Sequence, residues 1–498
     1  MQEAGGRSFG IRPTGGITST SRAALVIAVT LCAPACAGAP PPPRPNEPVT
    51  PTIRVGANVR VSDAQSRDTH YEVVIAAHPR DASRLIAASI VYPEGVASYG
   101  TIVYESSDGG STWTRARGLA GLGHTGDPAL AYGPDGLAYY VASSLPVVGE
   151  RRLLLFRSPD GGANWDGPFP LTYMDREYIT VDATAGPNRG RVYVNGNNRV
   201  PRTISDFVVF QSPDSGRSFS GPGTRRGFGG VQATVMGNAV VASDGALIGV
   251  YVESISLGSV IQAIWSIDGG TTLAGSARIG DYVAGGERKG AILGNANAEP
   301  ALAIDATSGR FKDRLYVVWP DRRSGHSQIL FAFSEDKGRT WSAARRINDN
   351  APSDTTDQFM PEIAVNRDGV VGVMWYDRRE HPDNLGWDAR FAASFDGGTS
   401  FTPSVRVSER GATFPPGTSR EKRASLTVPA DDQERLKAQI DAGRDSFMFM
   451  GGDTAGLVAD ALGIFHAAWV DNRTGVPQLW TATVTVRSTG ITHVPPSP

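Results

Sequence analysis

Short apolar runs of four or five residues recur along the chain, and a polar turn that contains glycine follows each of them. Five of these runs are Leu153–Phe156, Phe207–Phe210, Ile261–Trp265, Ile329–Phe333 and Ala389–Ala393. Short runs bounded by turn residues are typical of β-strands. Two more such runs precede the turn in each unit and another follows it, so the pattern predicts four strands per unit.

The unit around residue 330 shows the arrangement most clearly. Its runs are Ala301–Ile304, Leu315–Trp319, Ile329–Phe333 and, after the turn, Ser342–Ile347. Across the chain the turns begin at residues 106, 158, 212, 266, 334 and 394, so successive starts are 52 to 68 residues apart. Four strands in a repeat of this length predict the blade of an all-β propeller.

Each turn has the form Ser, any residue, Asp, any residue, Gly, any residue, Thr, Ser or Asn, and then a large apolar residue. The Asp accepts hydrogen bonds from backbone N–H groups a few residues on, and the Gly supplies a positive φ, so we predict a structural turn. These octapeptides resemble the Asp-box, or bacterial neuraminidase, repeat, and the resemblance implies the same structural role. The aspartates concerned are Asp108, Asp160, Asp214, Asp268, Asp336 and Asp396.

A seventh unit lies at the C-terminal end. Trp469–Gln478 aligns without gaps on Trp319–Gln328, but the unit ends after the run Leu479–Val484, with no Asp-box turn and no fourth strand. The segment Ile53–Ser62 resembles the fourth strand of the sixth unit, Pro403–Ser408. We therefore predict seven blades, with the N-terminal strand closing the last one. Six blades are the alternative if the first unit is irregular.

The N-terminal residues predict export. Residues 1–22 carry three Arg, and the apolar run Ala23–Leu31 that follows is too short to span a membrane. We predict a signal peptide over residues 1–36, with Cys36 as the lipidated residue of a bacterial lipoprotein at the cell surface or in the periplasm. Ordinary cleavage after residues 35–37, giving a secreted protein, is the alternative. A Pro-rich linker follows over residues 37–51.

The sequence also predicts where the propeller begins and ends. Residues 52–487 form the propeller, with an insertion at 418–444 and a tail at 488–498. In the insertion, Leu436 and Ile440 lie on one side and Gly443 lies beyond the end, a pattern that predicts a short helix.

The charge and the cysteines limit the possible partners. The 48 basic and 50 acidic residues form no charged run, which argues against a nucleic-acid partner. Both cysteines precede residue 37, so the mature chain has no disulfide. We expect a monomer that meets a membrane only through a lipid anchor.

Two polar sets are expected on the face opposite the Asp-box turns. One is a Trp-x-Asp-x-Arg motif that provides Arg323, Arg379 and Arg473, which together could grip a carboxylate. The alternative, that each Asp caps its turn and pairs with its own Arg, has the greater weight. The other set is acidic and precedes the first strand of several units, near the mouth of the channel: Asp127, Asp175, Glu177, Glu299, Asp357, Glu362 and Asp453.

Asp-box turns on a propeller also resemble sialidases. That resemblance implies three arginines on the carboxylate of sialic acid, a Tyr–Glu nucleophile pair and an Asp acid or base. The candidates here are Arg323, Arg379, Arg473 and Asp453 for ligand binding, and Tyr178, Glu177, Tyr376, Asp127, Glu299 and Glu362 for catalysis. The chain departs from the family in having seven predicted blades instead of six. It also has His70–Val74 where the family has an Arg-Ile-Pro motif.

These observations predict an exported sialidase-like propeller that recognises glycans, with exo-sialidase-type hydrolysis left open. The alternative is a non-catalytic, surface-anchored scaffold that binds proteins through exposed aromatic residues such as Trp387 and Phe414. A pair of carboxylates could also hydrolyse other glycans. No His or Cys residues have metal-ligand spacing, and we predict no cofactor, although the acidic set could hold Ca²⁺.

Overall fold

The computed structural model describes most of the predicted propeller. The described residues are 51–94, 99–119, 122–146, 149–198, 206–224, 232–255, 258–283, 299–307, 309–382, 384, 386–413 and 451–487. The predicted signal peptide with Cys36, most of the Pro-rich linker, the insertion at 418–444 and the tail lie outside these residues and stay predictions. Within the described part of the chain, no helix has the length and apolarity needed to span a bilayer.

The strands of the described residues form seven antiparallel sheets in chain order. Blade 1 comprises β3 (Thr69–Ala77), β4 (Leu85–Tyr92), β5 (Gly100–Ser106) and β6 (Thr114–Arg115). Blade 2 comprises β7 (Thr125–Tyr132), β8 (Ala138–Ser144), β9 (Arg152–Ser158) and β10 (Asp166–Thr172). Blade 3 comprises β11 (Asp175–Val181), β12 (Val192–Asn198), β13 (Asp206–Ser212) and β14 (Ser220–Thr224). Blade 4 comprises β15 (Gln232–Val241), β16 (Leu247–Ile255), β17 (Gly258–Ser266) and β18 (Gly275–Tyr282).

The last three blades continue this order. Blade 5 comprises β19 (Ala301–Ile304), β20 (Leu315–Asp321), β21 (Gln328–Ser334) and β22 (Arg345–Arg346). Blade 6 comprises β23 (Gln358–Val365), β24 (Val371–Asp377), β25 (Asp388–Ser394) and β26 (Val405–Arg406). Blade 7 comprises β27 (Gly456–Ala459), β28 (Phe465–Asp471), β29 (Gln478–Arg487) and, from the other end of the chain, β1 (Thr52–Val55) and β2 (Val59–Arg60). A short 3-10 helix, η1 (Asp63–Gln65), follows β2.

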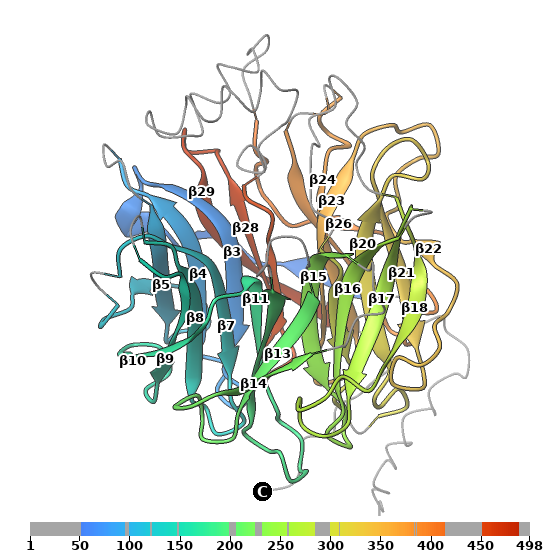
Figure 1. The fold of residues 1–498 in the computed structure, drawn as a ribbon. Coiled ribbons are helices and arrows are strands. Elements are labelled where there is room, and N and C mark those ends of the chain that lie inside the picture. The colour runs from blue at the N-terminus through green and yellow to red at the C-terminus, as the bar shows by residue number, and fades with distance from the viewer. Residues whose placement is uncertain are drawn as a thin grey trace, which may run out of the picture. The chain divides into compact units, whose positions relative to one another are not determined.

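The N-terminal strand closes the ring, as predicted. β1 pairs with β29 from Thr52 opposite Arg487 to Val55 opposite Val484, and β2 pairs with the same strand. The first strand of each blade contacts the first strand of the next, and β27 contacts β3 (Figure 1). The described residues therefore form a seven-bladed propeller of four-stranded blades, which confirms the predicted all-β fold and excludes the six-bladed alternative.

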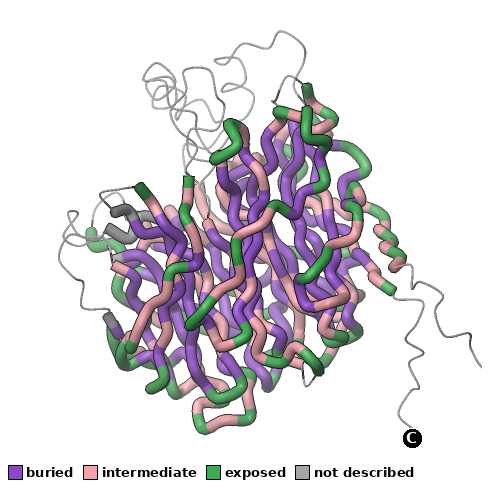
Figure 2. Tube along the Cα trace, turned by 90° about the vertical axis from the view of Figure 1, so that its right-hand side faces the viewer, coloured by how far each residue is buried: buried purple, intermediate pink, exposed green. Residues whose placement is uncertain are grey.

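The second strand of each blade is covered on both faces because neighbouring blades pack against it. Every residue of β20, β24 and β28 is buried (Figure 2). The tryptophans of the Trp-x-Asp-x-Arg motif, Trp319, Trp375 and Trp469, are among the largest fully buried side chains. Large apolar side chains on these strands fill the space between blades, so burial holds the ring together without disulfides.

The six repeated turns share one hydrogen-bond pattern. In the first turn the Ser106 hydroxyl donates to Asp108 at 2.8 Å, and the Asp108 carboxylate accepts from the backbone N–H and the hydroxyl of Thr112. In the third turn burial works against ionisation of Asp214, but hydrogen bonds from Ser212 and Ser218 outweigh it and lower its pKa to about 2. These carboxylates are occupied within their own turns, which fits a structural role.

Candidate active site

The first strands of five blades carry a β-bulge. At four of these bulges, in blades 1, 2, 3 and 6, a residue other than glycine has a left-handed backbone: Glu72 (φ 51°), Asp127 (φ 48°), Arg176 (φ 54°) and Met360 (φ 47°). A bulge re-aims side chains, and a left-handed backbone at residues other than glycine is strained and concentrates at functional sites. In blades 1 to 3 the strained residue lines a central cavity, and in blade 6 it is Glu362, two residues later, that does so.

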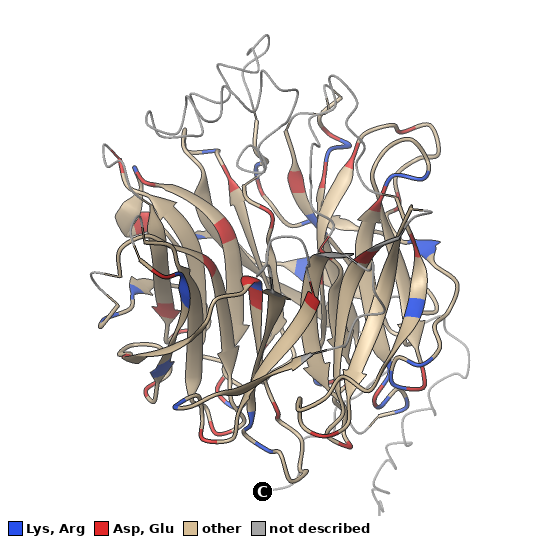
Figure 3. Cartoon of the chain, in the orientation of Figure 1, with Lys and Arg blue, Asp and Glu red and all other residues tan. Residues whose placement is uncertain are grey.

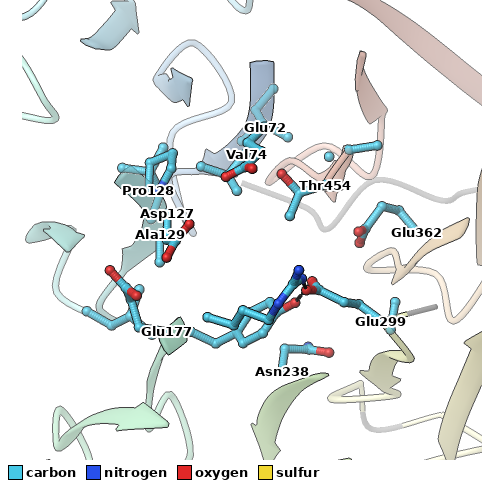
Figure 4. A pocket seen from close by; sticks show the side chains of 18 of the residues that line it. Glu72, Val74, Asp127, Pro128, Ala129, Glu177, Asn238, Glu299, Glu362 and Thr454 are labelled. Atoms are coloured by element: carbon cyan, nitrogen blue, oxygen red, sulfur yellow. Dashed lines mark hydrogen bonds and ion pairs between the residues drawn. The ribbon is translucent and has the colours of Figure 1, made fainter. Parts of the chain in front are cut away.

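The cavity has a volume of about 200 Å³, and the first-strand regions of all seven blades contribute to its wall (Figure 4). Its described lining includes one basic side chain, Arg176, and six acidic ones. The acidic residues are Glu72, Asp127, Glu177, Glu299, Glu362 and Asp453. Charged residues occur in the loops at the ends of the strands and along some strands, and the start of β11 adds charge near the centre of the ring (Figure 3). The cavity is therefore an acidic site.

Arg176 bridges two carboxylates that come from distant blades. Its guanidinium pairs with Glu299, just before β19, and with Asp453, just before β27. Burial alone would lower the pKa of Arg176, but the charges of Asp453, Asp127 and Glu72 raise it. The ion pairs therefore keep Arg176 charged.

Tyr178 belongs to the same group. Its hydroxyl donates a hydrogen bond to Glu299, on the oxygen that does not meet Arg176. Burial raises the pKa of Tyr178, which keeps the hydroxyl protonated as a donor. The structure thus pairs Tyr178 with Glu299, whereas the sequence suggested its neighbour Glu177.

The four carboxyl groups that Arg176 does not pair with have raised pKa values. Burial raises the pKa of Glu362 to about 8. Burial, with the charges of Asp175 and Asp453, raises the pKa of Asp127 to about 6. Burial raises the pKa values of Glu72 and Glu177 well above their usual range, with further contributions from neighbouring acids. The cavity therefore combines carboxyl groups paired with Arg176 and carboxyl groups whose pKa values are raised by burial, and such contrasting environments suit acid–base catalysis.

The arginines of the Trp-x-Asp-x-Arg motif lie elsewhere. Arg323, Arg379 and Arg473 each donate to the Asp two residues before them, at distances of 2.6–3.0 Å. None of the three is in the described lining of the cavity. The structure therefore does not bring them together around a ligand there, and their geometry is that of the local capping alternative.

We expect replacement of these arginines by Ala to destabilise the fold in the order Arg473, Arg379, Arg323. Their side chains are 8%, 17% and 43% exposed, and the Arg473 guanidinium also lies 4.2 Å from the Trp480 ring centre. Removing the partner of a buried carboxylate costs roughly 3–5 kcal/mol, and all three aspartates are buried. Where the arginine is more exposed, water reaches the carboxylate more easily after the substitution, so the cost falls from Arg473 to Arg323. Urea unfolding of the three variants measures the loss in the free energy of unfolding for each of them. A loss of glycan binding with unchanged stability would instead restore a ligand-binding role.

Other predicted residues also lie outside the cavity. Tyr376 is fully buried, and its hydroxyl accepts a hydrogen bond from the backbone N–H of Val470, so it is placed as a packing residue. Asp175 and Asp357 are not in the described lining. Trp387, predicted as an exposed anchor, is 3% exposed and donates to the Val470 carbonyl; that prediction was wrong, and Phe414 lies outside the described residues.

Five of the weak catalytic candidates and Asp453 do line the cavity, but sequence reasoning missed Glu72, Arg176, Asn238 and Thr454. Arg176 lies between two predicted site residues, Asp175 and Glu177. This position is the one feature of the sequence that could have indicated Arg176 as a site residue. No group of three or more His, Cys, Asp or Glu side chains in the described ranges is arranged to hold a metal ion.

No protein-family model matches the chain, and no curated protein matches it in sequence. Similar solved structures include a protein of unknown function from Dyadobacter fermentans, 15% identical, with a TM-score of 0.45 over 65% of this chain and 94% of that one. The Hadza microbial sialidase Hz136 is 15% identical, with a TM-score of 0.43 over 87% and 68%. An α-L-arabinofuranosidase from Fusarium graminearum is 12% identical, with a TM-score of 0.42 over 86% and 98%. We transfer no site residue from these structures.

Proposed function

We propose that this protein is a glycan-recognising propeller that hydrolyses a glycosidic bond in its central cavity. One observation carries the proposal: the cavity holds a carboxyl group, Glu299, that is fixed by Arg176 and Tyr178, together with a second carboxyl group, Glu362, whose pKa is raised by burial to about 8. Two carboxyl groups in different environments, one paired with an arginine and one whose pKa is raised by burial, are the usual apparatus of glycoside hydrolysis.

In the proposed reaction Glu362 is the general acid and Glu299 is the general base. The glycosidic C–O bond breaks as Glu362 gives its proton to the leaving oxygen. A water molecule attacks the anomeric carbon and gives its proton to Glu299. Arg176 and Tyr178 hold the Glu299 carboxylate in place, and solvent later returns a proton to Glu362 and removes the one on Glu299.

The test is hydrolysis of a panel of fluorogenic aryl glycosides and sialosides by the whole chain. We expect turnover of at least one substrate, and its loss in Glu299→Gln, which keeps the size of the side chain but removes the base. Glu335→Gln is the matched control, because Glu335 is an exposed partner of Arg314 that does not line the cavity. Melting temperatures verify that all three proteins are folded.

Two results would contradict the proposal. The first is binding of a glycan in the cavity without turnover of any panel member, which would make the protein a binding module. The second is turnover that Glu299→Gln leaves unchanged, which would place the chemistry on other residues.

A further inference from the structure

Glu177 is one of the acidic cavity residues that the proposed reaction does not use. It is 4% exposed, and neither of its carboxyl oxygens has a hydrogen-bond partner among the described residues. The side chain points into the cavity from β11, on the side opposite Glu362 (Figure 4). A buried polar group without a partner is costly unless a bound molecule satisfies it.

The charge balance limits what that bound molecule can be. Arg176 is the one basic side chain in the described lining, and Glu299 and Asp453 already occupy it. The lining thus has six acidic side chains for one basic side chain, so the cavity is strongly acidic. A carboxylate on the ligand would meet this acidic wall, and no described lining residue offers it a free guanidinium; the arginines proposed from the sequence lie elsewhere.

We infer that the sugar unit bound in this cavity carries no carboxylate, and that Glu177 donates a hydrogen bond to it. The inference rests on the proposed function, since it names the substrate class of the same site. It departs from the sialic-acid specificity that the sequence resemblance implies. As a protonated acid, Glu177 is suited to an uncharged oxygen acceptor, such as a sugar hydroxyl, and not to a metal ion.

The experiment measures binding to matched pairs of sugars. Calorimetry at pH 7 on the whole protein compares aryl glucoside with aryl glucuronide, aryl galactoside with aryl galacturonide, and the methyl ester of an aryl sialoside with the free acid. We expect the uncharged member of at least one pair to bind about tenfold or more tightly than its acid, because the net negative charge of the cavity repels the carboxylate.

Three variants test the residues. Glu177→Leu removes the donor, and we expect it to weaken binding of the uncharged sugar by roughly tenfold. Glu177→Gln keeps an N–H donor and should retain most of the affinity. Asp453→Asn frees one side of Arg176 and should narrow the preference against carboxylated sugars. Glu335→Gln should change neither property.

Failure of the inference and failure of the proposed function can be told apart. Equal or tighter binding of the carboxylated members, or binding of no pair at all, would overturn the inference. Hydrolysis of a free sialoside alone would leave the hydrolase standing and overturn the substrate class. Selective binding of an uncharged sugar without hydrolysis would leave the inference standing and remove the hydrolase.

Discussion

Replacing Arg176 with Met is expected to lower the free energy of unfolding by roughly 3–5 kcal/mol. Met is apolar and of similar length, so the change removes the charge and leaves most of the volume. Glu299 and Asp453, both largely buried, then lose their shared partner and must either stay charged in the cavity or take up protons. Urea unfolding at pH 7 measures the loss, and we expect it to shrink at lower pH, where protonation relieves both carboxylates.

The control is Arg157→Met. The side chain of Arg157 is even less exposed than that of Arg176, but its partner Asp166 is 67% exposed and keeps its hydration when the arginine is removed. We expect this variant to cost about 1 kcal/mol from the ion pair. A triple variant, Arg176→Met with Glu299→Gln and Asp453→Asn, should recover much of the stability, because it leaves no unpaired charge. Equal losses in Arg176→Met and Arg157→Met would contradict the assigned role of the bridge.

The fold was predictable because its signals are local and repeated. Six turns at regular spacing define the blades, and the missing fourth strand of the last unit pointed to Ile53–Ser62, which the structure places on β29 as β1 and β2. Each of these inferences needs only the composition and spacing of short segments. The pairing between the two ends of the chain could be predicted because the last unit has three strands and needs a fourth to complete its blade.

The site was predictable only in part, because its geometry arises between blades. The acids before the first strands could be placed near the channel, which is where Asp127, Glu299, Glu362 and Asp453 lie. The bulge that turns Arg176 inward could not be predicted from the sequence. Glycine usually marks a left-handed backbone, but the left-handed residues in these bulges are Glu, Asp, Arg and Met. The pairing of Tyr178 with Glu299 joins residues 121 positions apart, a distance that spacing arguments cannot measure.

Repetition also explains why the more visible motif was misleading. Arg323, Arg379 and Arg473 recur at equivalent positions because each stabilises the same turn in its blade. In each turn the Asp accepts a hydrogen bond from the Arg two residues later. The cavity residues differ from blade to blade: Glu in blade 1, Asp in blade 2, and Arg, Glu and Tyr in blade 3. In this propeller the structural residues repeat, and the candidate catalytic residues are those that break the repeat.

The pH dependence of hydrolysis should identify Glu362 as the acid. Burial raises its pKa from 4.5 to about 8, so the proton needed by the leaving group is present at neutral pH and is lost above pH 8. We expect kcat/KM to be nearly level around pH 7 and to fall about tenfold per pH unit above pH 8. Glu362→Gln should lower kcat/KM by roughly 10²- to 10⁴-fold and abolish this alkaline decline.

The same shift makes an opposite prediction for stability. A carboxyl group whose pKa is higher in the folded protein stabilises the fold fully below its unfolded pKa of 4.5, and this stabilisation is lost as the pH rises toward 8. Glu362→Gln cannot ionise, so its stability relative to wild type should increase as the pH rises from about 5 to 8. Unfolding curves across this range, with Glu335→Gln as the control, measure the difference. A variant that loses activity but shows no such gain would mean that Glu362 is ionised in the folded protein, and that the proton reaches the leaving group from another acid of the cavity.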